Sequence, residues 1–301
     1  MPLLRLYVDV STVAPSVFDS ALSLLPAAVH PSITRCHFSS DRALALGSAL
    51  LQRYLICTHY RHHTTLGSVP LHRDPANGRP YHGAVAIEEP DGQRAHGVED
   101  YNTSHHNPRQ DYPAGGERCL VAVAALVTAT PERRRRVGVD VAPTTYARSG
   151  AEEFVETFCG DAGSEAGVFT AAEAQWAMRA SATVERVRNV YLLWVLKEAY
   201  TKAVGVGIVG DLTKIEFRGL EGWDGQKRWR GAEVWVDGED ESERWYLEVS
   251  LLEGKMGGEG EGFFLAVCCE REALVEGDME GEWRELDLET DITGPWGGGG
   301  V

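Results

Sequence analysis

The chain has 301 residues, of which 43% are hydrophobic and 25% charged, and its net charge is −16. This composition supplies enough apolar side chains for a folded core, which excludes a chain that is disordered over most of its length. No run of about 18 uncharged apolar residues occurs, so we expect no transmembrane helix, and the N-terminal residues do not read as an export signal, so we expect a cytoplasmic protein.

The negative charge is concentrated near the C-terminus. Residues 1–215 carry 22 acidic and 21 basic side chains, whereas residues 216–301 carry 23 acidic and 8 basic ones. Nucleic-acid binding requires an extensive basic surface, so we expect no nucleic-acid partner. The six cysteines form no C-x-x-C pair, which argues against a zinc site or a disulfide framework, and we expect reduced thiols.

Hydrophobic periodicity predicts regular elements along the first half of the chain. In order, these are a strand over 3–10, a helix over 41–58 capped by Asp41, a strand over 119–128 and a strand over 137–141. Residues 59–107 are rich in His, Gly and Pro and are predicted to be mostly loops around short strands.

The second half begins with helices and continues with strands. Helices are predicted over 151–158, 171–181 and 190–204, and strands over 213–218, 232–236, 245–251 and 263–268. Gly205-x-Gly207-x-x-Gly210 follows a helix instead of a strand, which excludes a dinucleotide-binding fingerprint. We expect an α+β protein with an N-terminal lobe (1–130), a linker (131–136), a C-terminal lobe (137–292) and a disordered Gly-rich tail (293–301).

Three short segments carry residues suited to chemistry. Asp140 ends an apolar run, where a carboxylate is costly to bury unless it meets a cation; the plainer interpretation is a turn before Pro143. Glu198 and Lys202 are four residues apart and share a helix face, which also fits a surface ion pair. The third segment, Asn102-Thr103-Ser104-His105-His106, fits an ordinary polar loop when taken alone.

Together, these motifs resemble a known family. The chain resembles the larger, two-lobed 4′-phosphopantetheinyl transferases, also called holo-acyl-carrier-protein synthases, and within them the fungal branch. The resemblance spans about residues 33–218. It is carried by Gly78-Arg79-Pro80, Asn102-Thr103-Ser104-His105, Gly138-Val139-Asp140-Val141-Ala142 and the W-x-x-K-E-A-x-x-K run from Trp194 to Lys202. Many members have Glu where this chain has Ala142.

The resemblance implies a fold and an activity. The fold is two similar, pseudo-symmetric lobes, each a small antiparallel sheet with a long helix, with coenzyme A in the cleft between them. The activity is Mg²⁺-dependent transfer of the phosphopantetheine arm of coenzyme A to a serine of an apo carrier protein, with release of 3′,5′-ADP. Asp140 and Glu198 would bind Mg²⁺, and Lys202 would complete the catalytic set by neutralising the pyrophosphate. The remaining coenzyme A contacts would be Arg35, Arg79, Ser104 and His105.

Several alternatives stay open at this point. The carrier could be an acyl or peptidyl carrier protein or an aminoadipate-reductase-type domain, and we expect a monomer. Glu198 could take the serine proton directly or through a water. The run Arg133–Arg136 fits either a solvated connector or a docking surface for acidic carriers. A non-catalytic coenzyme A or carrier-binding module, and a phosphate-binding regulator that needs no Mg²⁺, are the competing functions.

Overall fold

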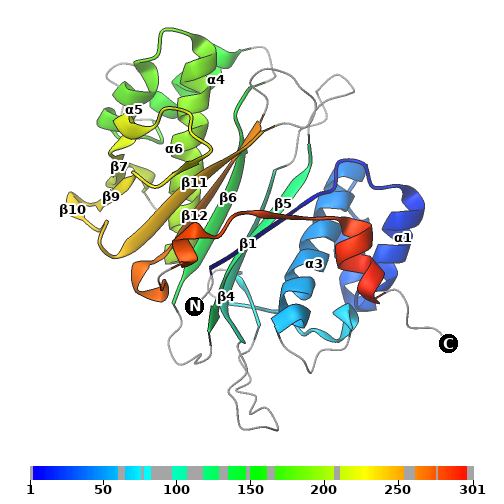
Figure 1. Ribbon diagram of the computed structural model, residues 1–301. Helices are drawn as coiled ribbons and strands as arrows, with labels where there is room; N and C mark the ends of the chain where they lie inside the picture. The colour runs from blue at the N-terminus through cyan, green and yellow to red at the C-terminus, as the bar shows by residue number, and fades with distance from the viewer. Residues whose placement is uncertain are drawn as a thin grey trace, which may run out of the picture. The chain divides into compact units, whose positions relative to one another are not determined.

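The computed structural model describes residues 3–59, 65–75, 78–82, 97–106, 118–128, 135–146, 150–160, 167–206, 211–253, 262–275 and 277–296. The chain divides into two compact units, each of mixed α+β structure (Figure 1). Unit 1 comprises Met1–Gln110, Gly115–Val137 and Ala273–Val301, and Gly138–Glu272 makes up nearly all of unit 2. Among the described helices, none has both the length and the apolar character needed to cross a membrane.

Unit 1 is built on a four-stranded sheet. Its strand order is β13 (Arg284–Leu286), β1 (Leu3–Asp9), β5 (Leu120–Thr128) and β4 (Gly97–His106). The pairs β1–β5 and β4–β5 are antiparallel, as expected, but β13 pairs with β1 in parallel. A parallel partner requires a long connection, and β13 reaches β1 from the far end of the chain.

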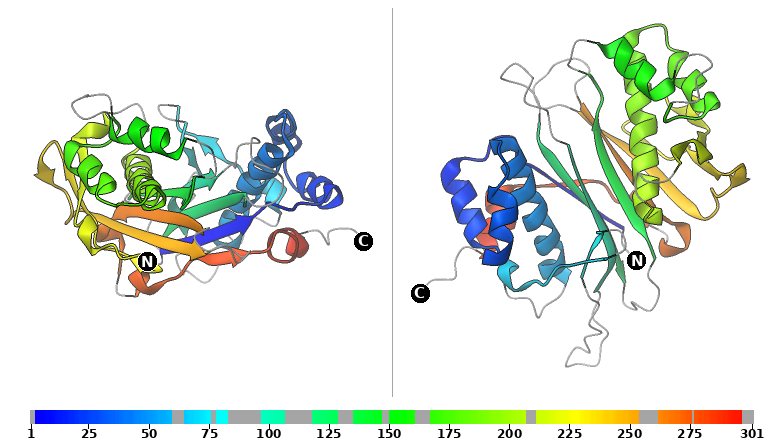
Figure 2. Two further views of the ribbon diagram at one scale, coloured as in Figure 1. Left: turned by 90° about the horizontal axis from the view of Figure 1, so that it is seen from above. Right: turned by 180° about the vertical axis from the view of Figure 1, so that it is seen from behind.

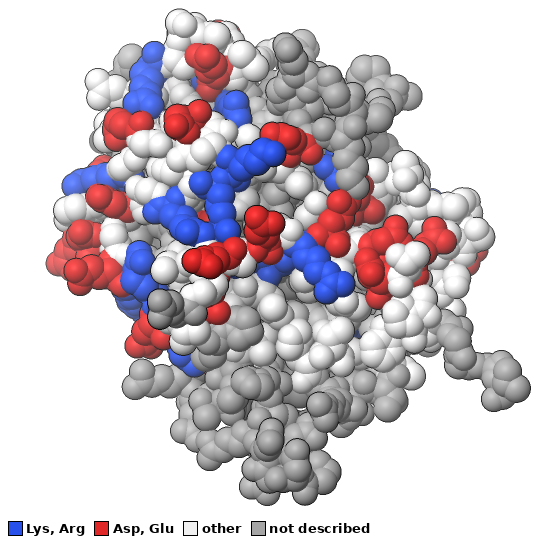
Figure 3. All heavy atoms as spheres, in the orientation of Figure 1, with Lys and Arg blue, Asp and Glu red and all other residues white. Residues whose placement is uncertain are grey.

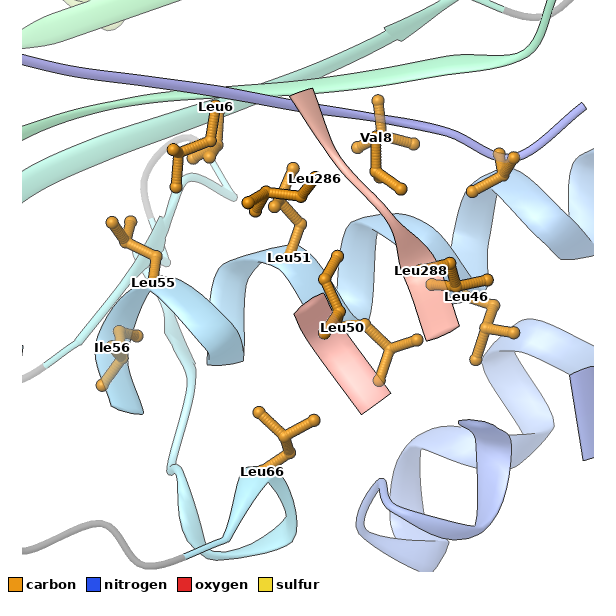
Figure 4. Close-up of a cluster of buried hydrophobic side chains, with 14 of the residues drawn as sticks. Leu6, Val8, Leu46, Leu50, Leu51, Leu55, Ile56, Leu66, Leu286 and Leu288 are labelled. Carbon is orange, nitrogen blue, oxygen red and sulfur yellow. The ribbon is translucent and has the colours of Figure 1, made fainter. Parts of the chain in front are cut away.

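The core of unit 1 lies between this sheet and helix α3 (Ser39–His59). Figure 4 shows leucines of α3 directed toward Leu6 and Val8 of β1 and toward Leu286 of β13. Gly47 lets the helix approach closely, since a Cβ there would lie 2.9 Å from a methyl group of Val10. Helices α1 (Pro15–Ser23) and α2 (His30–Thr34) add further contacts beside α3.

Unit 2 packs a long helix, α6 (Thr183–Val204), against a second four-stranded sheet (Figure 2). That sheet has the order β6 (Val137–Pro143), β12 (Gly262–Glu270), β11 (Trp245–Glu253) and β8 (Arg228–Trp229). Helices α4 (Ala151–Cys159) and α5 (Ala171–Met178) also contact α6. A smaller sheet is formed by β10 (Glu239–Asp240), β9 (Glu233–Val236) and β7 (Ile215–Arg218).

The structure confirms the α+β class but differs from the expected boundaries in several places. Helix α6 begins at Thr183 instead of Val190, and α1 was not predicted. A single ten-residue strand, β4, lies in the region predicted to be mostly loops. None of the six cysteines, all of which are described, forms a disulfide, as expected.

The C-terminal segment also differs from the expected lobes. From Ala273 onward the chain belongs to unit 1, whereas the sequence pattern placed residues up to 292 in the C-terminal lobe. Its helical turns, Leu288–Thr293 and Gly294–Trp296, extend past the predicted start of a disordered tail at 293, because Leu288 and Ile292 are buried in the core of unit 1. Residues 297–301, and residues 131–134 of the predicted linker, lie outside the described residues.

Candidate functional site

Strand β6 and helix α6 meet in backbone contact at Gly138. A Cβ at this position would lie 2.0 Å from the carbonyl oxygen of Ala199 and 2.5 Å from the amide nitrogen of Ala203, so only glycine fits. Side chains two residues apart on a strand point to the same face, and Asp140 therefore faces α6 as Gly138 does. The Gly138-Val139-Asp140 motif thus brings a carboxylate against the helix.

Asp140 meets both charged residues of the helical motif. The ammonium of Lys202 lies 2.6 Å from Asp140 Oδ1 and 3.9 Å from Glu198 Oε2. The carboxylate side chains are each only 8% exposed. Glu198 Oε1 is buried and has no hydrogen-bond partner among the described residues. Two buried carboxylates therefore share one ammonium, and one of their oxygens is left without a donor.

The electrostatics of Glu198 follow from this crowding. Burial, and after it the negative charge of Asp140, raise the pKa of Glu198 to about 7, against the opposing effect of Lys202. An additional positive charge beside the two carboxylates would relieve this repulsion. Mg²⁺ fits the donor set, because it prefers oxygen ligands and often takes only one or two carboxylates while keeping several waters. No cluster of three or more metal-binding side chains occurs within the described ranges.

Ala142 lies on the same face of β6 as Asp140. It is only 3% exposed and belongs to the apolar core that surrounds α6. The position where a third carboxylate could stand is therefore filled by a methyl group packed against the core.

Lys197, the neighbour of Glu198, forms structural contacts in the interior of unit 2. It is fully buried, its ammonium lies 2.9 Å from Glu173 Oε2, and it donates hydrogen bonds to the carbonyl oxygens of Leu212 and Ile215. Glu173 also accepts a hydrogen bond from the backbone N–H of Phe217. This pair ties α5 and β7 to α6 beside Glu198.

Glu173 was not among the residues predicted from the sequence motifs. A local signal for it does exist: Thr170 and Glu173 form a capping box at the start of α5, with the Thr-x-x-Glu spacing typical of that motif.

Unit 1 contains a cavity of about 510 Å³ lined by residues of α2, α3, β2 (His72–Arg73) and β4. Three arginines line it: Arg35, Arg53 and Arg73. None of the three forms an ion pair with a carboxylate in the part of the chain that the structure describes, although Asp41 also lines the cavity. The side chains that line the cavity therefore include three arginines and one aspartate, which leaves an excess of positive charge.

Arg53 is the most informative of the three arginines. It is only 4% exposed, its Nη1 donates to the carbonyl oxygen of Ala49, and its Nε has no partner among the described residues. Burial lowers its pKa, but a guanidinium stays protonated in proteins. A buried cation with an unused donor at a cavity wall favours an anionic ligand such as a phosphate.

The predicted coenzyme A contacts fall in different places. Arg35 and His105 line the cavity. Ser104 is buried on the opposite face of β4 from His105, as strand alternation requires, and does not line the cavity. Arg79 is buried and forms an ion pair with Asp100 at 2.5 Å. The phosphate contacts assigned to Ser104 and Arg79 stay predictions, and Arg53 and Arg73 are cavity residues that the sequence analysis did not assign.

The charged surface bears on the docking alternative. Arg133 and Arg134 lie outside the described residues, and Arg135 pairs with Glu99 at 3.1 Å. On the part of unit 2 that carries β9 and β10, acidic and basic side chains are interspersed (Figure 3). Pairs such as Arg218–Glu216 account for this mixing. Basic side chains of residues 216–301 thus lie beside acidic ones on this face.

Comparisons with known proteins agree with the motif pattern. The family model described as "4′-phosphopantetheinyl transferase superfamily" matches residues 136–268, and the model "4′-phosphopantetheinyl transferase, N-terminal" matches residues 12–109. The 4′-phosphopantetheinyl transferase pptA of Paxillus involutus is 27% identical over 207 residues, which cover 68% of this chain and 69% of that protein. The L-aminoadipate-semialdehyde dehydrogenase-phosphopantetheinyl transferase of Schizosaccharomyces pombe is 29% identical over 187 residues, which cover 60% of this chain and 58% of that protein.

Proposed function

Since the chain belongs to the 4′-phosphopantetheinyl transferase superfamily and is a transferase, we propose that it moves the phosphopantetheine arm of coenzyme A to a serine of an apo carrier protein and releases 3′,5′-ADP. The observation that carries this proposal is the group formed by Asp140, Glu198 and Lys202, in which a buried carboxylate oxygen lacks a donor. The presence of all three residues in one cluster favours catalysis over a non-catalytic binding module.

The residues of unit 2 would act on the pyrophosphate and on the serine. In the reaction the serine oxygen forms a bond to the β-phosphorus, and the bond from that phosphorus to the 3′,5′-ADP oxygen breaks. Lys202 would neutralise the pyrophosphate oxygens, and Glu198 would accept the serine proton directly or through a water. Asp140 and Glu198 would hold Mg²⁺, which when bound supplies further charge neutralisation at the pyrophosphate.

The cavity of unit 1 would bind the nucleotide end of coenzyme A. Arg35, Arg53 and Arg73 have no carboxylate partner among the described residues, so their charges are available to a phosphate. Arginine suits this role because its planar guanidinium can bind phosphate oxygens in a bidentate manner. We assign the 3′-phosphate to this cavity, with His105 as a further contact.

The acceptor class is part of the proposal, and the name of one relative supports one of the candidates. One relative is named for L-aminoadipate-semialdehyde dehydrogenase, which supports carrier domains of the aminoadipate-reductase type as acceptors. Acyl and peptidyl carrier proteins are the other candidates. A monomeric state and a cytoplasmic location stay predictions from the sequence.

A direct assay tests the transferase. The protein is incubated with coenzyme A, Mg²⁺ and each of three apo carriers, one of each class, and carrier masses are measured. At least one carrier should gain the mass of the phosphopantetheine arm. Asp140→Ala should lower the rate by at least about 100-fold, since it removes charge compensation worth several kcal/mol. Lys227→Ala, at a side chain that is 78% exposed, is the control and should keep the wild-type rate. Failure to modify any carrier would contradict the proposal.

A second assay tests the cavity. Replacing Arg53 or Arg73 by Met should raise KM for coenzyme A by about tenfold or more, because each change removes a charged donor from the phosphate. KM for 3′-dephospho-coenzyme A should change little, since that analogue lacks the group these arginines would bind. Equal effects on both substrates would mean that the cavity does not bind the 3′-phosphate.

A further inference from the structure

Strand β4 has a bulge where its pairing with β5 shifts register between Val98 and Asp100. Glu99 lies in this bulge, so Glu99 and Asp100 depart from the regular alternation of a strand. Both residues bind the segment just before the Asp140-bearing part of β6. Glu99 accepts a hydrogen bond of 2.8 Å from the backbone N–H of Arg135, and Asp100 accepts one of 2.9 Å from the backbone N–H of Val137.

Arg79 completes this arrangement. Its Nη2 donates to Asp100 Oδ2 at 2.5 Å and also to the carbonyl oxygen of Val137. Both backbone groups of Val137 are therefore bound by the Arg79–Asp100 pair. Arg79 is 8% exposed, and the side chain of Asp100 is 10% exposed. Removing one partner of an ion pair this deeply buried strongly destabilises the folded protein, because the remaining charge is left uncompensated.

Two backbone hydrogen bonds hold the segment that carries Arg79. The backbone N–H of Asp74 donates to the carbonyl oxygen of Arg79 at 2.8 Å, and the N–H of Gly78, which has φ +71, donates to the carbonyl oxygen of Asp74 at 2.7 Å. Their neighbours Arg73 and Pro80 line the arginine-rich cavity. The same few residues therefore form part of the cavity wall and bind the first residue of β6.

We infer that Glu99, Asp100 and Arg79 form a clamp on residues 135–137, and that Arg79 and Asp100 are positioning residues for Asp140, which lies three residues further along β6. All clamp contacts lie within unit 1. The inference rests on the proposed role of Asp140 in the transfer reaction. It gives Arg79 a task different from the phosphate contact that its sequence motif suggests.

Steady-state kinetics of Arg79→Met, Asp100→Asn and the double variant separate the two roles. A clamp predicts that each single variant lowers kcat by about tenfold or more while KM for coenzyme A changes less than about threefold. The double variant should be no slower than the slower single variant, because both changes break one interaction. A phosphate contact predicts instead a raised KM for Arg79→Met alone, with near-normal kinetics for Asp100→Asn. That pattern would overturn the clamp.

Hydrogen exchange supplies a readout that does not depend on activity. In Asp100→Asn, amide exchange over residues 135–143 should become faster, whereas unchanged exchange there would overturn the inference. Asp9→Asn is the matched control, because it breaks another part-buried Arg–Asp pair of unit 1, with Arg118 at 2.7 Å. The control should lower Tm without changing kcat or exchange over 135–143.

Two further outcomes keep the test decisive. If Arg79→Met does not fold, Arg79→Lys and Asp100→Glu take its place; each keeps the charge but alters the hydrogen bonds, and each should lower kcat by a smaller factor. Folded clamp variants with wild-type kcat would contradict the inference. Failure of the transferase proposal is recognised separately, since the wild-type protein would then modify no carrier while the exchange experiment could still be read.

Discussion

Glu198 is a buried carboxylate whose environment suits the proposed reaction but lowers the stability of the folded protein. It is buried beside a second carboxylate, and its Oε1 has no hydrogen-bond partner among the described residues. In the folded protein the pKa of Glu198 rises to about 7, whereas in the unfolded chain it has the ordinary glutamate value of 4.5. The folded state therefore binds more protons than the unfolded state between about pH 4.5 and 7.

The sign of this difference sets a pH dependence. Because the unfolded state binds fewer protons at this residue, the contribution of Glu198 to the free energy of unfolding of the metal-free protein should fall by up to about 3 kcal/mol as pH rises from about 4.5 to 7, and should level off above pH 7. Glu198→Gln should remove this contribution and be the more stable form at pH 8. Urea denaturation in the presence of a chelator, at pH 5, 6, 7 and 8, measures both proteins. A constant difference between them across this range would contradict the assigned cause.

Adding Mg²⁺ in place of the chelator should reverse the order of stability at pH 8. The wild-type protein would gain stability by binding the ion in its folded state, whereas Glu198→Gln lacks one carboxylate. Equal stabilisation of both proteins by Mg²⁺ would argue against Glu198 as a ligand.

The next residue along the helix gives a purely structural prediction. Lys197→Met should lower the free energy of unfolding by about 3–5 kcal/mol, because Glu173 would keep a buried charge without its partner. Adding Glu173→Gln to that variant should restore part of the loss by removing the unpaired charge. Thermal denaturation of the two variants and the wild type checks the order. A double variant less stable than Lys197→Met would contradict it.

At the scale of elements, the site depends on the contact between β6 and α6. Strand β6 is held at its start by backbone hydrogen bonds to the Arg79–Asp100 pair. One residue later, Gly138 brings it into backbone contact with α6. These two restraints, at the first two residues of β6, leave Asp140 little freedom to move away from Lys202.

Gly138→Ala tests this close packing. A methyl group 2.0 Å from a backbone oxygen of α6 cannot be relieved by side-chain rotation, so the strand and helix must separate. We expect a loss of at least about 2 kcal/mol in unfolding free energy. Gly222→Ala is the control, because the nearest atom to its added Cβ, Trp229 Nε1, would lie at an ordinary 3.7 Å. Chemical denaturation measures the free energy of unfolding of both variants. Equal losses would show that the close contact at Gly138 does not contribute more to stability than the loose contact at Gly222.

At the scale of the whole molecule, unit 1 is completed only by the last part of the chain. Strand β13 pairs with β1, and Leu286 and Leu288 lie in the same core as α3 (Figure 4). Ile292 is buried in that core as well. Each such side chain contributes about 1.5–3 kcal/mol by burial. The two ends of the chain therefore stabilise one unit.

Removing residues 273–301 should accordingly destabilise unit 1 far more than unit 2. We expect faster amide exchange in α3 and β1, with α6 and β12 closer to wild type, since β13 is lost from one sheet alone. A shorter truncation, which removes only the Gly-rich residues 297–301, serves as the control. Unchanged exchange in α3 and β1 after the longer truncation would contradict this account.

The elements that could be predicted from sequence are those with a strong local pattern. The leucine spacing of α3, the apolar run of β5 and the helical pattern ending at Gly205 each reflect one segment's own periodicity, which needs no partner to be visible. Glu198 and Lys202 belong to this class, because a spacing of four residues places both on one helix face wherever the helix packs. The family motifs in addition predicted a 4′-phosphopantetheinyl transferase, and both family models that match the chain carry that description.

Tertiary structure decided the features that depend on residues far apart in the chain. The parallel pairing of β13 with β1 has no local signal, since a three-residue strand gains its stability from a neighbour almost 280 residues away. Local sequence likewise could not show which arginines are paired. Arg79 is neutralised by Asp100, whereas Arg53 lies buried against a cavity without a described carboxylate partner. Charge in a sequence is visible at once, but whether it is available to a ligand depends on what the fold places beside it.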